Sequence, residues 1–211
     1  MNELCSTSAT ELAGLIRTRK VSSVEVVDAH LERIAEQNPT VNAVTTTLAD
    51  SARSAAAAVD RAVAVGEAVG PLAGVPFSVK ENIDVVGLDS TMGVSARQKH
   101  PADVDAVTVQ ALRRAGAIVL GKTNVPQLLL AAETENPIWG ITHNPWRLGR
   151  SPGGSSGGEA AALAAGMTPL GIGTDIGGSI RIPAHFCGIA GLKPTCDRWS
   201  NRGSVGAIPG Q

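Results

Sequence analysis

The sequence predicts an α/β fold on two observations. Amphipathic helical patterns alternate with short apolar runs bounded by glycine, proline or polar residues, which is the order expected when helices cover a sheet. The chain has 211 residues, of which 43% are hydrophobic, so it is long enough to bury a core of this kind. Since it shows neither an internal repeat nor a linker, we expect one domain or part of one.

Residues 1–70 are expected to form a mainly helical region. Two capping-box patterns, Ser8-x-x-Glu11 and Ser22-x-x-Glu25, each precede apolar residues at helical spacing. We expect the second helix to end at Asn38-Pro39, because proline disfavours a helical conformation in the residue before it. A strand over 42–48 and an alanine-rich helix over about 51–65 should follow.

Residues 71–211 are expected to form the segment that carries the chemistry. Its apolar runs alternate with helical patterns and with one long polar stretch that contains tryptophans. The expected elements are a short strand that runs into Lys80, a helix over 105–115, a buried strand over 117–120, a polar stretch over 133–152, a helix over 159–165 and a short strand over 169–173.

Composition excludes several function classes. The net charge of −1 gives no electrostatic footprint for nucleic acid, and the chain has few aromatic residues on which bases could stack. Three cysteines without C-x-x-C spacing argue against a disulfide framework or a zinc site and favour a reducing compartment. The sequence shows no signal peptide, and its apolar runs are too short to span a membrane. We therefore expect a cytoplasmic protein without a metal or a cofactor.

Two serines stand in glycine-rich segments, 24 positions apart. Ser155 lies within 153–158 and Ser179 within 173–181, and glycines there allow the backbone to approach a substrate closely. A serine nucleophile needs a base, and neutral lysine serves as one in Ser-Lys enzymes. Lys80 follows an apolar run, where burial would favour its uncharged form. A solvated lysine at a strand end is the alternative that the local sequence leaves open.

Three other interpretations of these segments are less favoured. Residues 116–123 match the phosphate-loop pattern, but 117–120 is itself strand-like and Pro126 interrupts the helix that should follow. Gly153-x-Ser155-x-Gly157 matches the nucleophile elbow of α/β-hydrolases, but a polar loop rather than a strand precedes it. A flexible linker over 153–158 is disfavoured because these residues lead directly into a helix, whose N-terminus favours anions.

The histidines give no strong metal signal. They are scattered along the sequence without metal-ligand spacing, and His30 fits a surface or packed position on a helix. His185-x-Cys187 has no further ligands nearby, so a metal site there is disfavoured.

The order of these segments resembles that of the amidase signature family, over residues 74–195. The matching segments share glycine-rich turns and fixed polar residues, and they are 74–83, 121–126, 144–146, 151–159, 173–184 and 186–195. The resemblance implies an amidase signature fold, in which helices cover both faces of a mixed central β-sheet. Because family members are considerably longer, it also implies that the C-terminal part of the domain is missing from this sequence.

The resemblance also implies roles for individual residues. Ser179 corresponds to the acylated nucleophile, Ser155 to a bridging serine after a cis peptide bond, and Lys80 to the base. The backbone N–H groups around Ile176, Gly177, Gly178 and Ser179 correspond to the oxyanion hole, and Leu129 matches a substrate-lining position. Asp175 and Arg181 flank the nucleophile, and we expect both to make structural hydrogen bonds.

The implied activity is hydrolysis of a small-molecule carboxamide through a serine acyl-enzyme. Two alternatives stay open, namely an amidotransferase A-type subunit that supplies ammonia and an inactive truncated fragment. The amino-acid sequence over 123–127 and 151–159 looks closer to that of fatty acid amide hydrolases than to that of the amidotransferase A subunit. A homodimer is one assembly that the sequence allows, and no nucleic-acid partner is expected.

Overall fold

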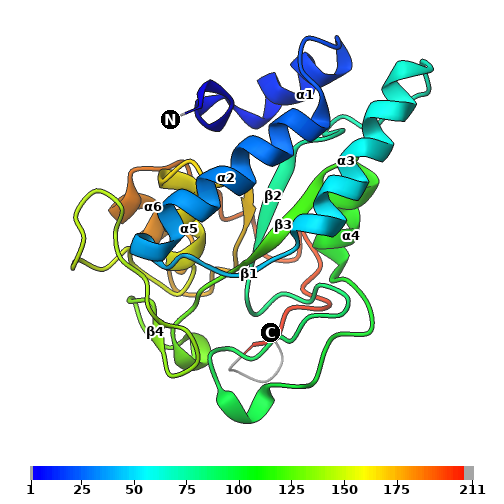
Figure 1. The fold of residues 1–211 in the computed structure, drawn as a ribbon. Helices are drawn as coiled ribbons and strands as arrows, with labels where there is room; N and C mark the ends of the chain where they lie inside the picture. Colours follow the sequence, from blue (N-terminus) through cyan, green and yellow to red (C-terminus); the bar gives the residue numbers. More distant parts are fainter. Residues whose placement is uncertain (1, 207–211) are drawn as a thin grey trace.

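The computed structural model describes residues 2–206, which form a mixed four-stranded sheet with helices on both faces (Figure 1). The strands of this sheet are β1 (Val44–Thr47), β2 (Pro76–Lys80), β3 (Ile118–Thr123) and β6 (Gly171–Ile172). Their order is β1-β3-β2-β6. β1 runs antiparallel to β3, whereas β2 runs parallel to both β3 and β6. The predicted α/β class and mixed central sheet are therefore confirmed.

Six α-helices and three short 3-10 helices occur within residues 2–206. The α-helices are α1 (Ala9–Arg17), α2 (Ser23–Val41), α3 (Ala49–Ala64), α4 (Val107–Arg114), α5 (Gly157–Ala164) and α6 (Arg181–Cys187). The 3-10 helices are η1 (Glu3–Ser6), η2 (Ser95–Arg97) and η3 (Gln127–Leu129), and a small hairpin pairs β4 (Glu135–Asn136) with β5 (Gly140–Ile141).

Each face of the sheet is covered by an apolar cluster. On one face, Leu31 of α2 and Ala161 of α5 pack with Leu120 of β3. On the other face, Val109 of α4 packs with Phe77 and Val79 of β2. A strand directs alternate side chains to opposite faces, so Ser78 and Lys80 point to the side of α5. This alternation brings Lys80, at the end of β2, to the helix that follows the first glycine-rich segment.

The N-terminal helices follow their capping signals, with one correction. Ser22 and Glu25 form a complete capping box at the start of α2. The predicted end of α2 at Asn38-Pro39 is wrong, because the helix continues to Val41 with Pro39 inside it. Pro39 lies in the last turn, where a missing N–H costs one hydrogen bond, and the Asn38 side chain accepts from the N–H groups that follow the helix.

Several short elements have no counterpart in the sequence prediction. α6 spans seven residues and contains Pro183, so it lacks a long apolar periodicity. The β4–β5 hairpin lies inside the expected polar stretch and has strands of two residues each. By contrast, the strand predicted over 42–48 is present as β1, which pairs with β3. Elements of this size are fixed by the contacts around them more than by their own sequence.

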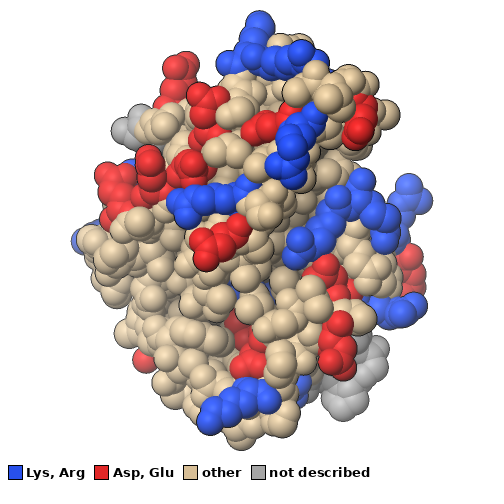
Figure 2. All heavy atoms as spheres, turned by 45° about the vertical axis from the view of Figure 1, so that its right-hand side comes forward, with Lys and Arg blue, Asp and Glu red and all other residues tan. Residues whose placement is uncertain are grey.

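Charged side chains of both signs are interspersed over the face in Figure 2, and a broad uncharged area occupies its lower left. Within residues 2–206, no helix combines the length and the apolar character needed to cross a bilayer.

Candidate active site

Lys80 and Ser155 meet at the end of β2. The Lys80 Nζ lies 2.7 Å from the Ser155 Oγ and 2.7 Å from the Thr174 Oγ1. The Lys80 side chain is fully buried and Ser155 is 2% exposed. A charged Nζ donates to both hydroxyls, whereas a neutral one has a lone pair that can accept the Ser155 proton. The arrangement places a base within reach of a serine in a dry environment.

Burial lowers the pKa of Lys80 from 10.5 to about 7. Desolvation is the largest cause, because the ammonium loses its hydration in the protein interior. The negative charges of Glu159 and Asp175 oppose this effect and keep the pKa from falling further. Near neutral pH a large fraction of Lys80 is therefore uncharged, and the alternative of a solvated lysine at a strand end is wrong.

The first glycine-rich segment is packed, not flexible. Residues 152–160 are all buried, and the Gly154–Ser155 peptide bond is cis. A Cβ on Gly154 would lie 2.6 Å from the Ala131 carbonyl oxygen, and one on Gly158 would lie 2.5 Å from the Asn124 carbonyl oxygen. Glycine is required at both places because neighbouring backbone fills the space that a side chain would need. These contacts confirm that the segment is not a linker.

Residues 173–180, between β6 and α6, form a loop that we call the Ser179 loop. It lies against the beginning of α5. The Ser156 N–H donates to the Ser179 carbonyl over 3.0 Å, and the Ser156 hydroxyl donates to the Thr174 carbonyl over 3.3 Å. The structure therefore brings Ser155 and Ser179 to one region of the fold. Among the described residues, their hydroxyls do not hydrogen-bond to each other, whereas Ser155 is bonded to Lys80.

Asp175 holds the Ser179 loop in shape. Its carboxylate accepts hydrogen bonds from the backbone N–H groups of Gly178, Ile180 and Arg181. The Arg181 guanidinium donates two further bonds, of 3.0 and 2.9 Å. Burial alone would raise the pKa of Asp175, but these donors hold it well below its usual range. The expected structural hydrogen bonding of Asp175 and Arg181 is confirmed.

The backbone N–H groups of the Ser179 loop differ in their availability. The Gly178 N–H already donates to Asp175 over 2.8 Å, and Gly178 has a φ of +119° that favours glycine. Ile176 and Gly177 are exposed, and no atom of the described residues lies within 4 Å of a Cβ placed on Gly177. Space for a ligand atom therefore exists beside Gly177.

Leu129 is the last residue of η3, and the loop that follows it packs onto Gly154. It is half-buried and, like Leu128, has a left-handed backbone conformation, with φ of 61°. The same loop continues to Ala131 and Glu133, whose carbonyl oxygens approach Gly154. Leu129 is therefore two residues from a segment that touches the Ser155 peptide.

Four polar side chains of the site had no role in the sequence interpretation. Thr174 bonds to Lys80, and the Glu159 carboxylate accepts hydrogen bonds from the hydroxyls of Ser78 and Thr123. Glu159 is 5% exposed, and burial raises its pKa to about 7. The available signal was a single acidic residue in the apolar, alanine-rich run of α5.

One alternative interpretation of the motifs, the phosphate loop, disagrees with the geometry. Gly121 and Lys122, which match the phosphate-loop pattern, lie inside β3, and the Lys122 Nζ donates to the Asp89 carbonyl and the Ser90 hydroxyl. A strand cannot wrap a phosphate as a flexible loop does. His30 is fully buried, with its Nδ1 2.8 Å from the Val26 carbonyl, as expected for a packed histidine. Residues 2–206 contain no cluster of His, Cys, Asp or Glu suited to a metal.

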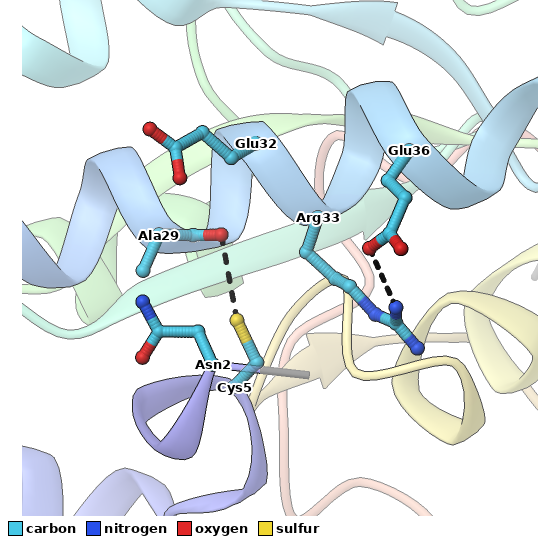
Figure 3. A pocket seen from close by; sticks show the side chains of 6 residues that line it. All are labelled: Asn2, Cys5, Ala29, Glu32, Arg33 and Glu36. Atoms are coloured by element: carbon cyan, nitrogen blue, oxygen red, sulfur yellow. Dashed lines mark hydrogen bonds and ion pairs between the residues drawn. The ribbon is translucent and has the colours of Figure 1, made fainter.

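A shallow pocket between the N-terminal segment and α2 is separate from this site (Figure 3). The Cys5 thiol donates to the Ala29 carbonyl over 3.4 Å, and Arg33 forms an ion pair with Glu36 at 2.7 Å. The pocket is lined by Asn2, Cys5, Ala29, Glu32, Arg33 and Glu36, none of which contacts Lys80 or Ser155 by a hydrogen bond.

Comparison with protein families gives a match to the family described as Amidase, over residues 25–211. Among curated proteins, the chain is 48% identical to the A-type subunit of glutamyl-tRNA(Gln) amidotransferase from Acidothermus cellulolyticus, over 97% of this chain and 41% of that protein. It is 45% identical to fatty-acid amide hydrolase 1 of Sus scrofa, over 95% of this chain and 33% of that protein. The two identities do not separate a hydrolase from an amidotransferase component.

Comparison with solved structures gives the same fold. The peptide amidase of Stenotrophomonas maltophilia matches with a TM-score of 0.89 and 36% identity, over 94% of this chain and 42% of that one. The chain therefore spans only between a third and about two fifths of the length of these relatives.

Proposed function

Because the chain belongs to the amidase signature family, we propose that it carries the catalytic residues of an enzyme that hydrolyses a carboxamide through an acyl-enzyme on Ser179. The observation that carries this proposal is the 2.7 Å contact between the buried Lys80 Nζ and the Ser155 Oγ. A lysine whose pKa lies at about 7 is a competent base at neutral pH. A second glycine-rich serine on a neighbouring loop supplies the nucleophile.

The proposed first half-reaction moves one proton through two hydroxyls. Neutral Lys80 accepts the Ser155 proton, Ser155 accepts the Ser179 proton, and the Ser179 Oγ attacks the amide carbonyl carbon. The carbonyl π electrons move onto its oxygen, which gives a tetrahedral intermediate. When that oxygen re-forms the double bond, the C–N bond breaks, and the proton returns through Ser155 to the leaving amine or ammonia.

The second half-reaction uses the same groups. Water loses a proton to the relay and attacks the Ser179 ester, and the Ser179 Oγ leaves and is reprotonated. The product is a carboxylic acid, which loses its proton to the solvent and becomes a carboxylate, and Lys80 is again neutral. The relay requires the Ser179 hydroxyl to rotate towards Ser155, because the two hydroxyls are not bonded in this structure.

We assign the oxyanion hole to the backbone N–H groups of Ile176, Gly177 and Ser179. Their loop is fixed by Asp175, so the donors do not need to reorganise when charge develops on the substrate oxygen. The Gly178 N–H is not assigned to the oxyanion hole, because it donates to Asp175. Gly178 instead gives the loop a backbone conformation with a positive φ. Such donors are each worth about 3–4 kcal/mol in the transition state of other acyl-transfer enzymes.

The remaining assignments follow from this site. We propose that Leu129 lines the route of a small-molecule amide, because the loop that follows it packs onto Gly154. We also propose that residues 71–211 form the catalytic segment behind a helical region over 1–70, that the protein acts in the cytoplasm, and that a homodimer is its assembly. Gel filtration with light scattering tests the assembly.

A second candidate function is an amidotransferase component that releases ammonia from glutamine. The 48% identity to the A-type subunit of an amidotransferase favours it. Ammonia release that depends on glutamine and rises with a partner protein would support this candidate. Hydrolysis of simple carboxamides without a partner would support the amidase.

The nucleophile is tested by labelling the chain with a fluorophosphonate, which phosphonylates activated serines. We expect labelling at Ser179, its loss in Ser179→Ala and its retention in Ser95→Ala, because Ser95 is exposed and lies outside the site. Labelling that survives in Ser179→Ala would overturn the nucleophile assignment. An unlabelled wild-type chain would mean that these 211 residues do not form a working site and would support the inactive-fragment alternative.

A further inference from the structure

Glu159 is a buried carboxylate that connects the elements on which the proposed reaction depends. It lies in the first turn of α5, four residues after Ser155, and its side chain is directed onto the sheet. One of its oxygens accepts from the Ser78 hydroxyl of β2, and the other accepts from the Thr123 hydroxyl of β3 at 2.5 Å. Three elements of the site thus meet at one side chain.

The sheet register makes these contacts specific to the neighbourhood of Lys80. Ser78 precedes Lys80 by two residues and shares its face, and Thr123 is the register partner of Lys80 in the neighbouring strand. Gly171 of β6 pairs with Ser78, and a Cβ on Gly171 would clash with the Glu159 carboxylate. The absence of a side chain at Gly171 therefore leaves room on the sheet for the Glu159 carboxylate beside Lys80.

The buried charge has no cationic partner within hydrogen-bond distance among the described residues. Both of its oxygens are bonded to hydroxyls, which are neutral donors. A buried carboxylate is costly unless it is paired, and no contact with Arg or Lys compensates this one directly. Lys80 is the only charged side chain that stabilises the ionised form of Glu159 electrostatically in the described part of the chain.

We infer that Glu159 is a positioning residue whose buried carboxylate holds β2, β3 and α5 together and electrostatically governs when Lys80 binds its proton. The inference rests on the proposed function, in which Lys80 must be uncharged to accept a proton. An ionised Glu159 stabilises the ammonium form of Lys80, so removing this charge should make Lys80 lose its proton at lower pH.

Other charges near Lys80 do not duplicate this role. Asp175, from the Ser179 loop, also stabilises the charged form of Lys80, but its carboxylate is already paired with Arg181. Glu81, the next residue of the chain, accepts from Thr91 and Met92 backbone groups. Lys122 of β3 faces Asp89 and Ser90, and β6 has no ionisable residue.

The test measures the pH dependence of fluorophosphonate labelling in Glu159→Gln, which keeps the shape of the side chain and removes its charge. The acidic limb of the plot of labelling rate against pH should move to lower pH by about one unit. A nearby opposite charge ordinarily shifts a pKa by one to three units, and the substitution removes such a charge from beside Lys80. At pH 7, where Glu159 is still partly ionised, the variant should therefore retain a larger share of its maximal rate than the wild type. A purely structural role would lower the rate at every pH and leave the limb in place.

A direct readout of Lys80 keeps the inference testable apart from catalysis. The chain is labelled with 13Cε-lysine, the Lys80 resonance is assigned by its absence in Lys80→Met, and its titration is followed by NMR. We expect Glu159→Gln to shift this titration to lower pH and Glu81→Gln, a matched buried carboxylate, to leave it unchanged. If Glu159→Gln does not fold, Ser78→Ala should produce a smaller shift in the same direction, because it removes one donor to the carboxylate.

The outcomes separate this inference from the proposed function. Loss of labelling in Ser179→Ala together with an unmoved Lys80 titration in both Glu159→Gln and Ser78→Ala would overturn the role of Glu159 and leave the amidase proposal standing. Labelling that persists in Ser179→Ala together with a shifted Lys80 titration would overturn the proposed function and leave the electrostatic coupling standing.

Discussion

Replacing Lys80 by methionine tests the electrostatic cost of burying this lysine. Methionine has a similar length, fits an apolar environment and carries no charge. The substitution removes the hydrogen bonds from Nζ to Ser155 and Thr174, which changes stability by an amount that does not depend on pH in the neutral to alkaline range. The dependence of the stability difference on pH therefore isolates the protonation of Lys80.

The magnitude follows from the pKa in the two states. Folding lowers the pKa of Lys80 from 10.5 to about 7. Since one pKa unit is worth 1.36 kcal/mol, the protonated lysine destabilises the folded state by about 5 kcal/mol. Between these two pH values the unfolded chain binds one more proton than the folded chain, so the stability of the wild type rises with pH by about 1.4 kcal/mol per unit. Below pH 7 the full cost is present.

The assay is urea unfolding followed by far-UV circular dichroism at pH 7.5, 8.5 and 9.5. Across this range, the unfolding free energy of the wild type should rise relative to that of Lys80→Met by about 3 kcal/mol, because the range covers two pH units. Ionisable groups that do not interact with Lys80, including the buried Lys122, are common to both chains and cancel in the difference. Glu159 adds to the rise, because its pKa increases when the charge of Lys80 is removed. Lys20→Met, at an exposed position, is the control and should show no such trend.

A difference that stays constant between pH 7.5 and 9.5 would refute this reasoning. It would mean that Lys80 keeps its proton in the folded chain and cannot act as a base near neutral pH. The proposed relay through Ser155 would then lose its physical basis.

Three further predictions concern the surroundings of the site. Thr174→Val should move the acidic limb of Ser179 labelling to lower pH, because the Thr174 hydroxyl accepts from the charged form of Lys80; an unmoved limb would contradict this. Asp175→Asn should lower the maximal labelling rate, because the amide holds the Ser179 loop and Arg181 less well, and should move the acidic limb to lower pH, because Asp175 stabilises the charged form of Lys80; an unchanged maximal rate would contradict the role of Asp175 in fixing the loop of the assigned oxyanion hole. Gly158→Ala should lower the unfolding free energy by about 1–3 kcal/mol through overpacking against Asn124, whereas Gly14→Ala, with free space in α1, should raise it by about 0.5–1 kcal/mol; thermal unfolding of both checks the sign.

The fold could be predicted where the sequence carries its own local signals. Ser22 and Glu25 mark the start of α2 because their side chains satisfy the first N–H groups of the helix. The proline rule failed at Pro39 because the Asn38 side chain and the left-handed Asn42 complete the last turn around it. Helix α6 could not be predicted, because its seven residues are held by the Ser179 loop and by contacts with α5.

The candidate site could be predicted only in part. The apolar run before Lys80 indicated burial, and the glycines around Ser155 indicated close packing, and the structure has both. Thr174 and Glu159 were missed because their partners lie 94 and 81 positions away in the chain, so only the folded sheet brings them together. The bond between Gly178 and Asp175 was missed for a different reason, because the direction of a backbone N–H depends on the loop conformation.

Lys80 and Lys122 show why a shifted pKa alone does not identify a base. Both lysines are buried, and desolvation lowers the pKa of Lys122 to about 8, close to that of Lys80. Lys122 donates to the Asp89 carbonyl and to Ser90, and the latter lies in the segment fixed by Glu81 on the far face of the sheet. Lys80 instead contacts Ser155, which adjoins the Ser179 loop through Ser156. Because burial is nearly the same for both, it is the neighbouring hydroxyl that gives Lys80 a route to a nucleophile and leaves Lys122 with a structural role.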